Sequence, residues 1–168
     1  GRRPGPDGAF AVLRAVSDSH VEIAFRIHAE FDLLPPNTGL PVRAASYTPA
    51  CFLGRLVLNR SAGTVEYFRM GVPTDKAMNV HVTASDYDHD LIRVDRMELA
   101  GGKLQNVDGI AWVDQIDTLE AHHRLAKIFY KFKEINWVAF DRALAIARTQ
   151  KKPILAVVLW GALEDQSC

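Results

Sequence analysis

The sequence predicts an α+β fold, in which an antiparallel β-rich region is followed by a region of helices and one strand. Apolar and polar residues alternate strictly over residues 20–33, which is typical of a half-buried antiparallel strand. Two apolar runs flank the sequence NRSAG at residues 59–63, which indicates a β-hairpin. From residue 117 onward, apolar residues recur at helical spacing instead. The two kinds of structure therefore lie in successive parts of the chain.

The composition is that of an ordinary globular chain. Its 168 residues include 20 basic and 20 acidic residues, so the formal net charge is zero. This balance argues against nucleic acid as a partner, because nucleic-acid-binding proteins carry a basic patch or stripe. No apolar run reaches the roughly 18 residues of a membrane helix, and no signal-peptide pattern follows Gly1. We expect a soluble chain with no nucleic-acid partner.

The chain has two cysteines, Cys51 and Cys168. Two cysteines form at most one disulfide, so they leave the cellular compartment open. Cys51 precedes an apolar strand, and there we expect it to be buried as a small hydrophobic residue.

Residues 1–19 are expected to form a flexible N-terminal segment, because the chain begins with the Gly-, Pro- and Arg-rich sequence GRRPGPDG. Within this segment, residues 9–19 are apolar enough for a short helix or a strand. The strand at residues 20–33 then places two sets of side chains on opposite faces. The apolar set is Val21, Ile23, Phe25, Ile27, Ala29, Phe31 and Leu33, and the other set is Glu22, Ala24, Arg26, His28, Glu30 and Asp32.

A hairpin is predicted next, from strands at residues 53–58 and 64–70. Gly63 lies in its turn, where a positive φ is expected. A second strand pair is predicted from residues 79–84 and 91–99, joined by SDYDHD. Weak strand character over GIAWV ends a β-rich domain that we place at residues 20–116.

The first helix is predicted over residues 117–132, with an N-cap at Asp117 or Thr118. Its apolar face comprises Leu119, Leu125, Ile128 and Phe129. A second helix carries an apolar stripe and ends before Pro153, and the stripe comprises Phe140, Leu144 and Ala147.

The run Ile154–Trp160 is apolar without alternation, which predicts a strand buried on both faces. A strand with open edges pairs readily with another chain. We therefore expect this run either to dock on the β-rich domain or to join two copies in a homodimer.

Three aspartates at alternate positions, Asp86, Asp88 and Asp90, imitate the start of a calcium-binding loop. The remainder of that pattern fails, because Leu91 stands where glycine is needed and Met97 stands where a bidentate glutamate belongs. We interpret the segment as a solvated loop and keep a weak cation site as an alternative. The histidines show no metal-binding spacing, so we assign no metal ligand.

The end of the chain has the layout of a thioredoxin active-site region. A helix, Lys152-Pro153, an apolar strand and Trp160 precede a short loop with Cys168. In the thioredoxin fold the redox cysteines follow the central strand, at the N-terminus of the next helix, where backbone N–H groups stabilise a thiolate. We therefore interpret residues 117–168 as an incomplete thioredoxin-like domain, although the usual Cys-x-x-Cys pair is absent.

Two stretches, FRIHAEF (Phe25–Phe31) and LWGALEDQSC (Leu159–Cys168), resemble the selenoprotein N family, and specifically its bacterial members. The resemblance extends over residues 20–168. In that family a selenocysteine and a glycine follow the positions of Ser167 and Cys168. The resemblance implies a thioredoxin-like thiol oxidoreductase. Vertebrate members are glycoproteins of the endoplasmic reticulum membrane with a calcium-binding EF-hand, two features that this sequence does not match.

The resemblance also implies roles for the terminal residues. Cys168 would be the resolving thiol beside a selenocysteine, and Ser167 shares its motif. Four residues would flank the site: Trp160, Gly161, Asp165 and Gln166. No other cofactor is expected, and the substrate would be a protein or small-molecule disulfide. Because the next position would hold the selenocysteine, either a translational stop or a deliberate cut would end the chain at Cys168, and we expect little turnover from it.

Two other functions remain open from the residues themselves. The β-rich domain alone would suit a non-catalytic binding module. The aspartates at positions 86, 88 and 90 would suit a weak calcium sensor.

Overall fold

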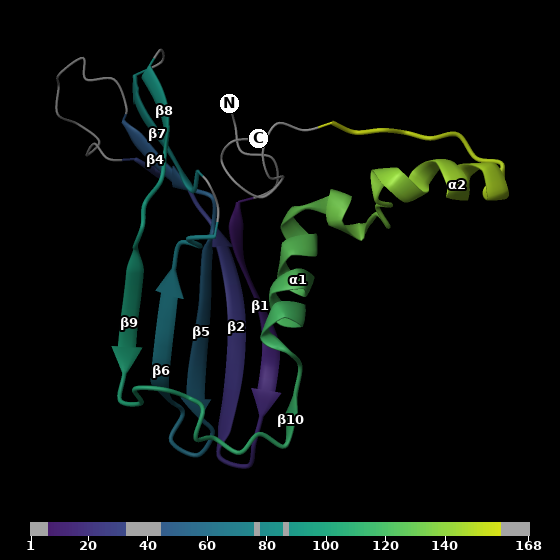
Figure 1. Ribbon diagram of the computed structural model, residues 1–168. Helices are drawn as coiled ribbons and strands as arrows, with labels where there is room; N and C mark the ends of the chain where they lie inside the picture. Colours follow the sequence, from purple (N-terminus) through teal and green to yellow (C-terminus); the bar gives the residue numbers. More distant parts are fainter. Residues whose placement is uncertain (1–6, 33–44, 76–77, 86–87, 159–168) are drawn as a thin grey trace.

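A computed structural model describes residues 7–32, 45–75, 78–85 and 88–158. Within these residues, strands form two antiparallel sheets, and two α-helices follow them in the chain (Figure 1). The predicted α+β fold class is confirmed. Neither helix is long and apolar enough to cross a membrane.

The larger sheet has six strands in the order β10-β1-β2-β5-β6-β9. These strands are β1 (Gly8–Val16), β2 (His20–His28), β5 (Phe52–Asn59), β6 (Thr64–Gly71), β9 (Glu98–Gly102) and β10 (Asp114–Gln115). The smaller sheet has four strands in the order β3-β4-β7-β8. They are β3 (Phe31–Asp32), β4 (Ser46–Pro49), β7 (Val80–Ser85) and β8 (Asp88–Ile92).

The predicted flexible segment at residues 1–19 is corrected over much of its length. Residues 8–16 form β1, which pairs with β2 along its whole length. The strand alternative for residues 9–19 is therefore the right one, and the β-rich region begins near residue 8. The physical reason is the register, which places the apolar residues of β1 opposite those of β2.

The hairpin is confirmed, because β5 and β6 pair across the turn and Gly63 has φ 63°. The prediction of one strand over residues 91–99 is wrong. Its start belongs to β8, which pairs with β7, and its end belongs to β9, which pairs with β6. Residues 109–113 form no strand, and the short strand β10 follows them instead. These errors share a cause, since the partner of an edge strand is not visible in local sequence.

Helix α1 (Thr118–Phe129) confirms the first predicted helix. Asp117 is its N-cap, and its side chain accepts a hydrogen bond of 2.7 Å from the Leu119 backbone N–H. The buried residues of α1 are Ala121, Leu125, Ala126 and Phe129. The predicted apolar face is therefore right for Leu125 and Phe129, whereas Leu119 is largely exposed.

Helix α1 packs on β1 and β2, against the face that sequence marks as polar. Ala121 and Leu125 form a core cluster with Ala24, and Val12 packs beside them. Alternation in β2 is confirmed, but the face with Glu22, Ala24, Arg26 and His28 is the buried one, and on the other face only Phe25 is buried. The helix supplies the covering layer on that side, so these side chains lie inside the protein.

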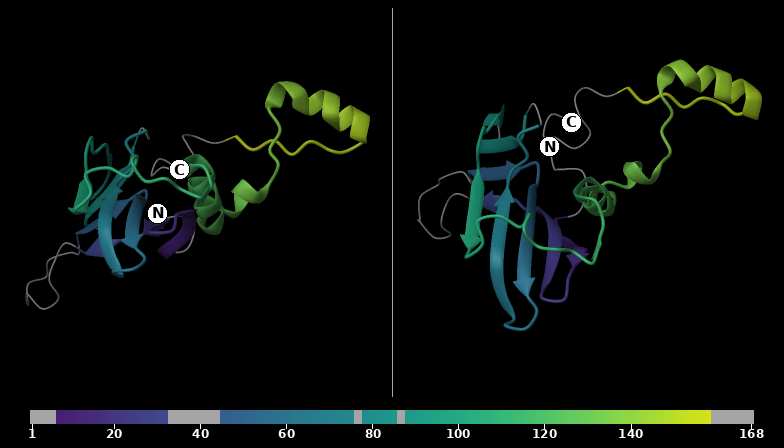
Figure 2. Two further views of the ribbon diagram at one scale, coloured as in Figure 1. Left: turned by 90° about the horizontal axis from the view of Figure 1, so that it is seen from below. Right: turned by 60° about the horizontal axis from the view of Figure 1, so that its bottom comes forward.

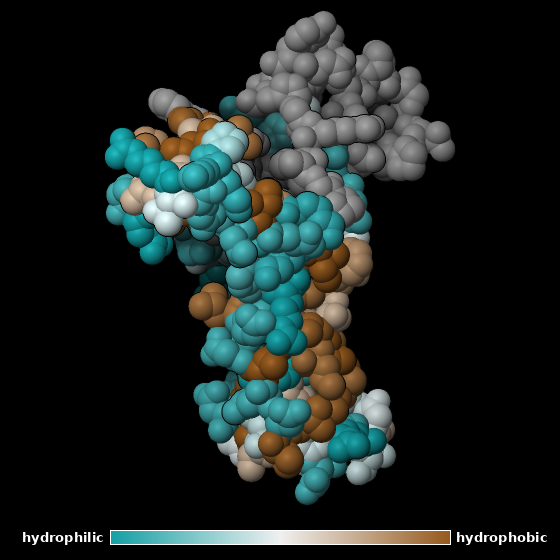
Figure 3. Space-filling model, turned by 90° about the vertical axis from the view of Figure 1, so that its right-hand side faces the viewer, coloured by the Kyte–Doolittle hydropathy of each residue, from teal (hydrophilic) through white to brown (hydrophobic). Residues whose placement is uncertain are grey.

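The opposite face of the six-stranded sheet is apolar and partly open. The register joins Leu13, Ile23, Leu56 and Phe68 in one row across four strands. Leu13, Val65 and Leu99 remain about half exposed. In the space-filling view the apolar residues gather along one side, next to the hydrophilic surface of the molecule (Figure 3).

The C-terminal part extends away from both sheets, as all the ribbon views show (Figures 1 and 2). A 3₁₀ turn (Lys131–Glu134) leads to α2 (Phe140–Gln150), which confirms the second helix. Helix α2 has no buried residue, and Phe140 on its apolar stripe is 85% exposed. Residues 154–158 form no strand and do not dock on the β-rich region, so that predicted docking is wrong for the described part of the run. A strand needs a neighbour for its hydrogen bonds, and none of the described residues pairs with this run.

Candidate functional site

The residues predicted for the redox site lie outside the described part of the chain. They are Trp160, Gly161, Asp165, Gln166, Ser167 and Cys168. The assignment of these residues stays a prediction. Within the described residues, polar side chains converge elsewhere, on the sheet face that α1 partly covers.

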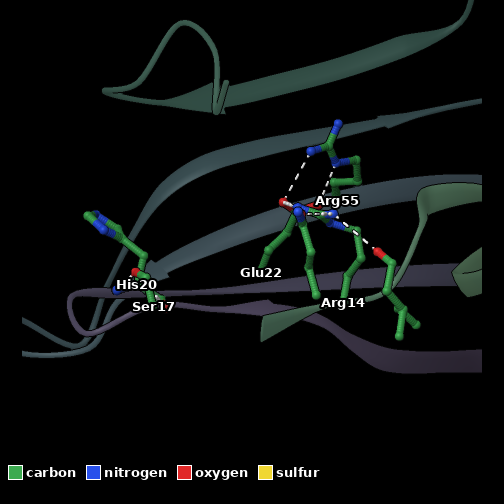
Figure 4. A network of polar contacts seen from close by, with 7 residues as sticks. Arg14, Ser17, His20, Glu22 and Arg55 are labelled. Atoms are coloured by element: carbon green, nitrogen blue, oxygen red, sulfur yellow. Dashed lines mark hydrogen bonds and ion pairs between the residues drawn. The ribbon is translucent and has the colours of Figure 1, made fainter. Parts of the chain in front are cut away.

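The centre of this face is Glu22, whose side chain is 0% exposed. Arg14 Nη2 donates to Glu22 Oε2 at 2.5 Å from the neighbouring strand β1. Arg55 of β5 donates from Nε to Oε1 at 2.6 Å and from Nη2 to Oε2 at 3.1 Å. Figure 4 shows the three side chains meeting, with one guanidinium nitrogen of Arg55 pointing away from the carboxylate. We call Arg14, Glu22 and Arg55 the inner triad.

The two arginines make the buried Glu22 carboxylate stable in its ionised form. Burial by itself would raise the pKa of Glu22, but hydrogen bonds from Arg55 and Arg14, with their positive charges, lower it below its ordinary value. The carboxylate in turn raises the pKa of Arg55. A buried charge without such partners would be costly, so the three side chains form one unit.

Arg26 and His28 lie on the same buried face of β2 as Glu22, nearer the end of the strand. Arg26 Nε donates to His28 Nε2 at 2.8 Å, which requires that nitrogen to be unprotonated. The His28 ring stacks on Phe129 of α1 with ring centroids 3.8 Å apart. The Arg26 guanidinium lies 5.1 Å from the centroid of the Tyr130 ring. Aromatic residues at the end of α1 thus cover the polar end of the strand.

A second group of the same kind lies on β6, β9 and the loop before β9. Glu98 forms ion pairs with Arg69 Nε and, at 3.3 Å, with Arg96 Nη2. Hydrogen bonds from Arg69 lower the pKa of Glu98. We call Arg69, Glu98 and Arg96 the outer triad. Arg69 is directly opposite Arg55 in the register of β5 and β6, so the triads adjoin.

A cleft of about 630 Å³ lies at the outer triad and reaches Arg55 of the inner triad. Its lining includes both arginines and the glutamate of the outer triad, Arg55 from the inner one, and an apolar wall; the residues are Leu53, Gly54, Arg55, Tyr67, Arg69, Gly71, Val72, Pro73, Thr74, Asp95, Arg96, Met97, Glu98 and His122. His122 comes from α1. Desolvation and the nearby Arg26 and Arg55 lower the pKa of His122, so the ring is neutral at pH 7.

A second cavity of about 380 Å³ adjoins the cleft at His122. Cys51 lines this cavity and is 2% exposed, which confirms that it is buried. His123 and Lys133 also line it. Cys51 therefore lies beneath a cavity and not on the outer surface.

The candidate calcium residues are only partly described. Asp86 lies outside the described residues, Asp88 begins β8, and Asp90 lies within β8 and is exposed. Within the described ranges no group of three metal-binding side chains is close enough to hold an ion. The solvated loop and the weak cation site both stay predictions, although the loop is shorter than expected because β8 begins at Asp88.

Sequence reasoning missed both triads. The alternation of charged residues in β2 is compatible with a solvent-facing side, and it gives no sign that a helix covers that side. One signal was available, since Glu22, Arg26 and His28 alternate on the same face of a single strand. The partners of Glu22, Arg14 and Arg55, become apparent only from the strand register, and so does the position of Arg69 opposite Arg55.

Comparison with known proteins finds vertebrate relatives. The chain is 33% identical to selenoprotein N of Mus musculus and 32% identical to those of Danio rerio and Homo sapiens, in each case over 99% of this chain. It spans about a third of the length of these relatives, 33% to 35%. No family model and no solved structure matches the chain.

The family resemblance predicted from FRIHAEF and LWGALEDQSC is thereby confirmed over nearly the whole chain. The bacterial origin inferred at the same time stays a prediction, because the relatives found are vertebrate proteins. Over the third of selenoprotein N that it spans, this chain is similar to selenoprotein N along 99% of its own length.

Proposed function

We propose that this chain is part of a thiol/selenol–disulfide oxidoreductase of the selenoprotein N type, with its redox centre at Cys168 and the position after it. The observation that supports the proposal is the relationship to selenoproteins N over 99% of the chain. A selenoprotein contains selenocysteine, and LWGALEDQSC is the stretch that resembles the region before that residue in this family.

A selenol is ionised at neutral pH and would supply the nucleophile of such a centre. Cys168 would act second. When one sulfur of a substrate disulfide is joined to selenium and the other has left as a thiolate, the Cys168 thiolate attacks the selenium. This step forms a selenium–sulfur bond, releases the second substrate thiolate and completes a two-electron reduction. An external thiol must then reduce the selenium–sulfur bond before another turnover.

The proposal is tested with a longer protein that carries selenocysteine, or cysteine in its place, after Cys168. We expect this longer protein to reduce the disulfides of insulin, with dithiothreitol as electron donor. The 168-residue chain should show little or no turnover, because a single thiol cannot complete the cycle. Robust insulin reduction by the 168-residue chain would contradict the proposed centre.

Two cysteine variants of the longer protein give a matched comparison. Cys168→Ser should lower turnover, because the mixed selenenyl sulfide is then resolved only by the external thiol and no longer within the protein. Cys51→Ala should retain turnover, since the Cys51 side chain is only 2% exposed. Loss of turnover in Cys51→Ala alone, with the fold intact, would assign the redox role to Cys51 instead.

A further inference from the structure

We infer that the 630 Å³ cleft between α1, β5, β6 and β9 binds a ligand that carries a carboxylate on an apolar body. The inference concerns the β-rich part of the chain and is independent of the proposed redox centre. It depends on the arginine pairs of the two triads and on the walls of the cleft.

The first argument is charge. Each triad joins two arginines to one glutamate, so each has one more positive charge than negative charge. Asp95 also lines the cleft, but it pairs with Arg93 at 3.1 Å. The negative charge of Asp108 also attracts Arg55, although Asp108 does not line the cleft. His122 is neutral at pH 7 and leaves this balance unchanged.

The second argument is the position of Arg55 and Arg69. They are directly opposite each other on adjacent strands, where like charges are destabilising. Both line the cleft, and so does Arg96. A guanidinium has five N–H donors, and the bonds from these three arginines to glutamate, together with the bond between Arg69 and Tyr67, use only some of them. An anion in the cleft would receive the remaining donors and offset the repulsion between the two strands.

The third argument is shape. Gly71 lines the cleft, and a Cβ at this position would come within 2.9 Å of the Met97 backbone carbonyl. Glycine thus keeps the loop before β9 close to β6. Leu53, Val72 and Met97 form the apolar part of the lining, so a ligand would have an apolar body beside its charged group.

The apolar part of the lining favours a carboxylate on an apolar body over inorganic phosphate, which has no apolar part. The cations that line the cleft are arginines, whose planar forks bind carboxylate and phosphate oxygens alike, so the apolar body makes the difference. Both free acids and peptide carboxylates have this chemistry.

The inference is tested by NMR titration of the full, isotope-labelled chain with three probes: hexanoate, the peptide Gly-Leu-Glu and inorganic phosphate. Hexanoate stands for a small acid and the peptide for a protein segment. We expect saturable shifts of the Arg55 and Arg69 Nε–H signals and of the Val72 and Met97 methyl groups with at least one carboxylate probe. The carboxylate probe that binds more tightly shows whether the ligand is a small acid or a protein segment. No saturable shift with either, or tighter binding of phosphate than of both, would overturn the inference.

Substitutions locate the binding. Arg69→Gln and Arg96→Gln remove exposed arginines, so both variants should fold, and each should weaken binding by about tenfold or more, as expected for a charged hydrogen bond. Arg124→Gln is the matched control, since this exposed arginine pairs with Glu120 and lines neither cavity. Binding that survives both cleft variants, or that Arg124→Gln weakens equally, would also overturn the inference.

Discussion

Two regions of this chain differ in which side chains they bury: one buries a charged residue, and the other leaves apolar residues exposed. In the sheet covered by α1, the charged Glu22 is 0% exposed. In the C-terminal part, the apolar Val158 is 93% exposed and α2 buries no residue. Burial therefore follows the presence of a covering layer more closely than it follows the polarity of a side chain. A charge can be buried where partners neutralise it, and an apolar residue stays in water where no surface packs on it.

The largest expected loss of stability comes from breaking the inner triad. Glu22→Gln leaves Arg14 and Arg55 without their shared carboxylate, and it should lower the free energy of unfolding by about 3–5 kcal/mol. Chemical denaturation followed by circular dichroism measures this change. Glu120→Gln is the control, because it breaks an exposed pair with Arg124 and should leave the unfolding midpoint unchanged. Equal effects of the two substitutions would mean that burial of the triad has no energetic importance.

The same substitution in the two helices sharpens the comparison. Leu125→Ala in α1 removes a side chain that is 1% exposed, and it should cost about 2–4 kcal/mol of stability. Leu144→Ala in α2 removes one that is about half exposed, and it should cost less than about 0.5 kcal/mol. Thermal and urea unfolding of both variants measure the difference. A cost for Leu144→Ala as large as that for Leu125→Ala would show that α2 is packed in solution.

Lowering the pH should destabilise the sheet region against unfolding, because Glu22 becomes protonated. Its pKa is lower in the folded protein than its ordinary value of 4.5, so the unfolded chain binds a proton first as the pH falls. The contribution of Glu22 to stability is complete above about pH 4.5 and is lost as the pH falls through the folded pKa. Denaturation midpoints measured from pH 6 to pH 3 should drop more steeply for the native chain than for Glu22→Gln. Parallel curves would rule out this role of the carboxylate.

The smallest effect is expected from removing the C-terminal part. A chain that ends at Glu134 keeps both sheets, α1 and the 3₁₀ turn, and its unfolding free energy should stay within about 1 kcal/mol of the full chain. Hydrogen exchange should likewise show protected amides in α1 and nearly unprotected ones in α2. A large loss of stability on truncation would mean that residues 135–158 pack on the sheet region in solution.

The sequence by itself determined the local features of this protein. The N-cap at Asp117, the turn at Gly63 and the two helices follow from patterns within a few residues, and the structure confirms them. The similarity to selenoprotein N follows from sequence too, because FRIHAEF and LWGALEDQSC resemble that family and the relatives match along the chain. Such features depend on neighbours in the chain, so local patterns suffice for them.

Only the tertiary structure decided which face of β2 is buried and which side chains meet there. Alternation divides the residues of a strand between two faces, but it does not say which face a helix covers. The inner triad combines residues 14, 22 and 55, and the outer triad joins residue 69 to residues 96 and 98. These side chains come together through the strand pairings and the loop before β9, so the arginine-lined cleft exists only in the folded sheet.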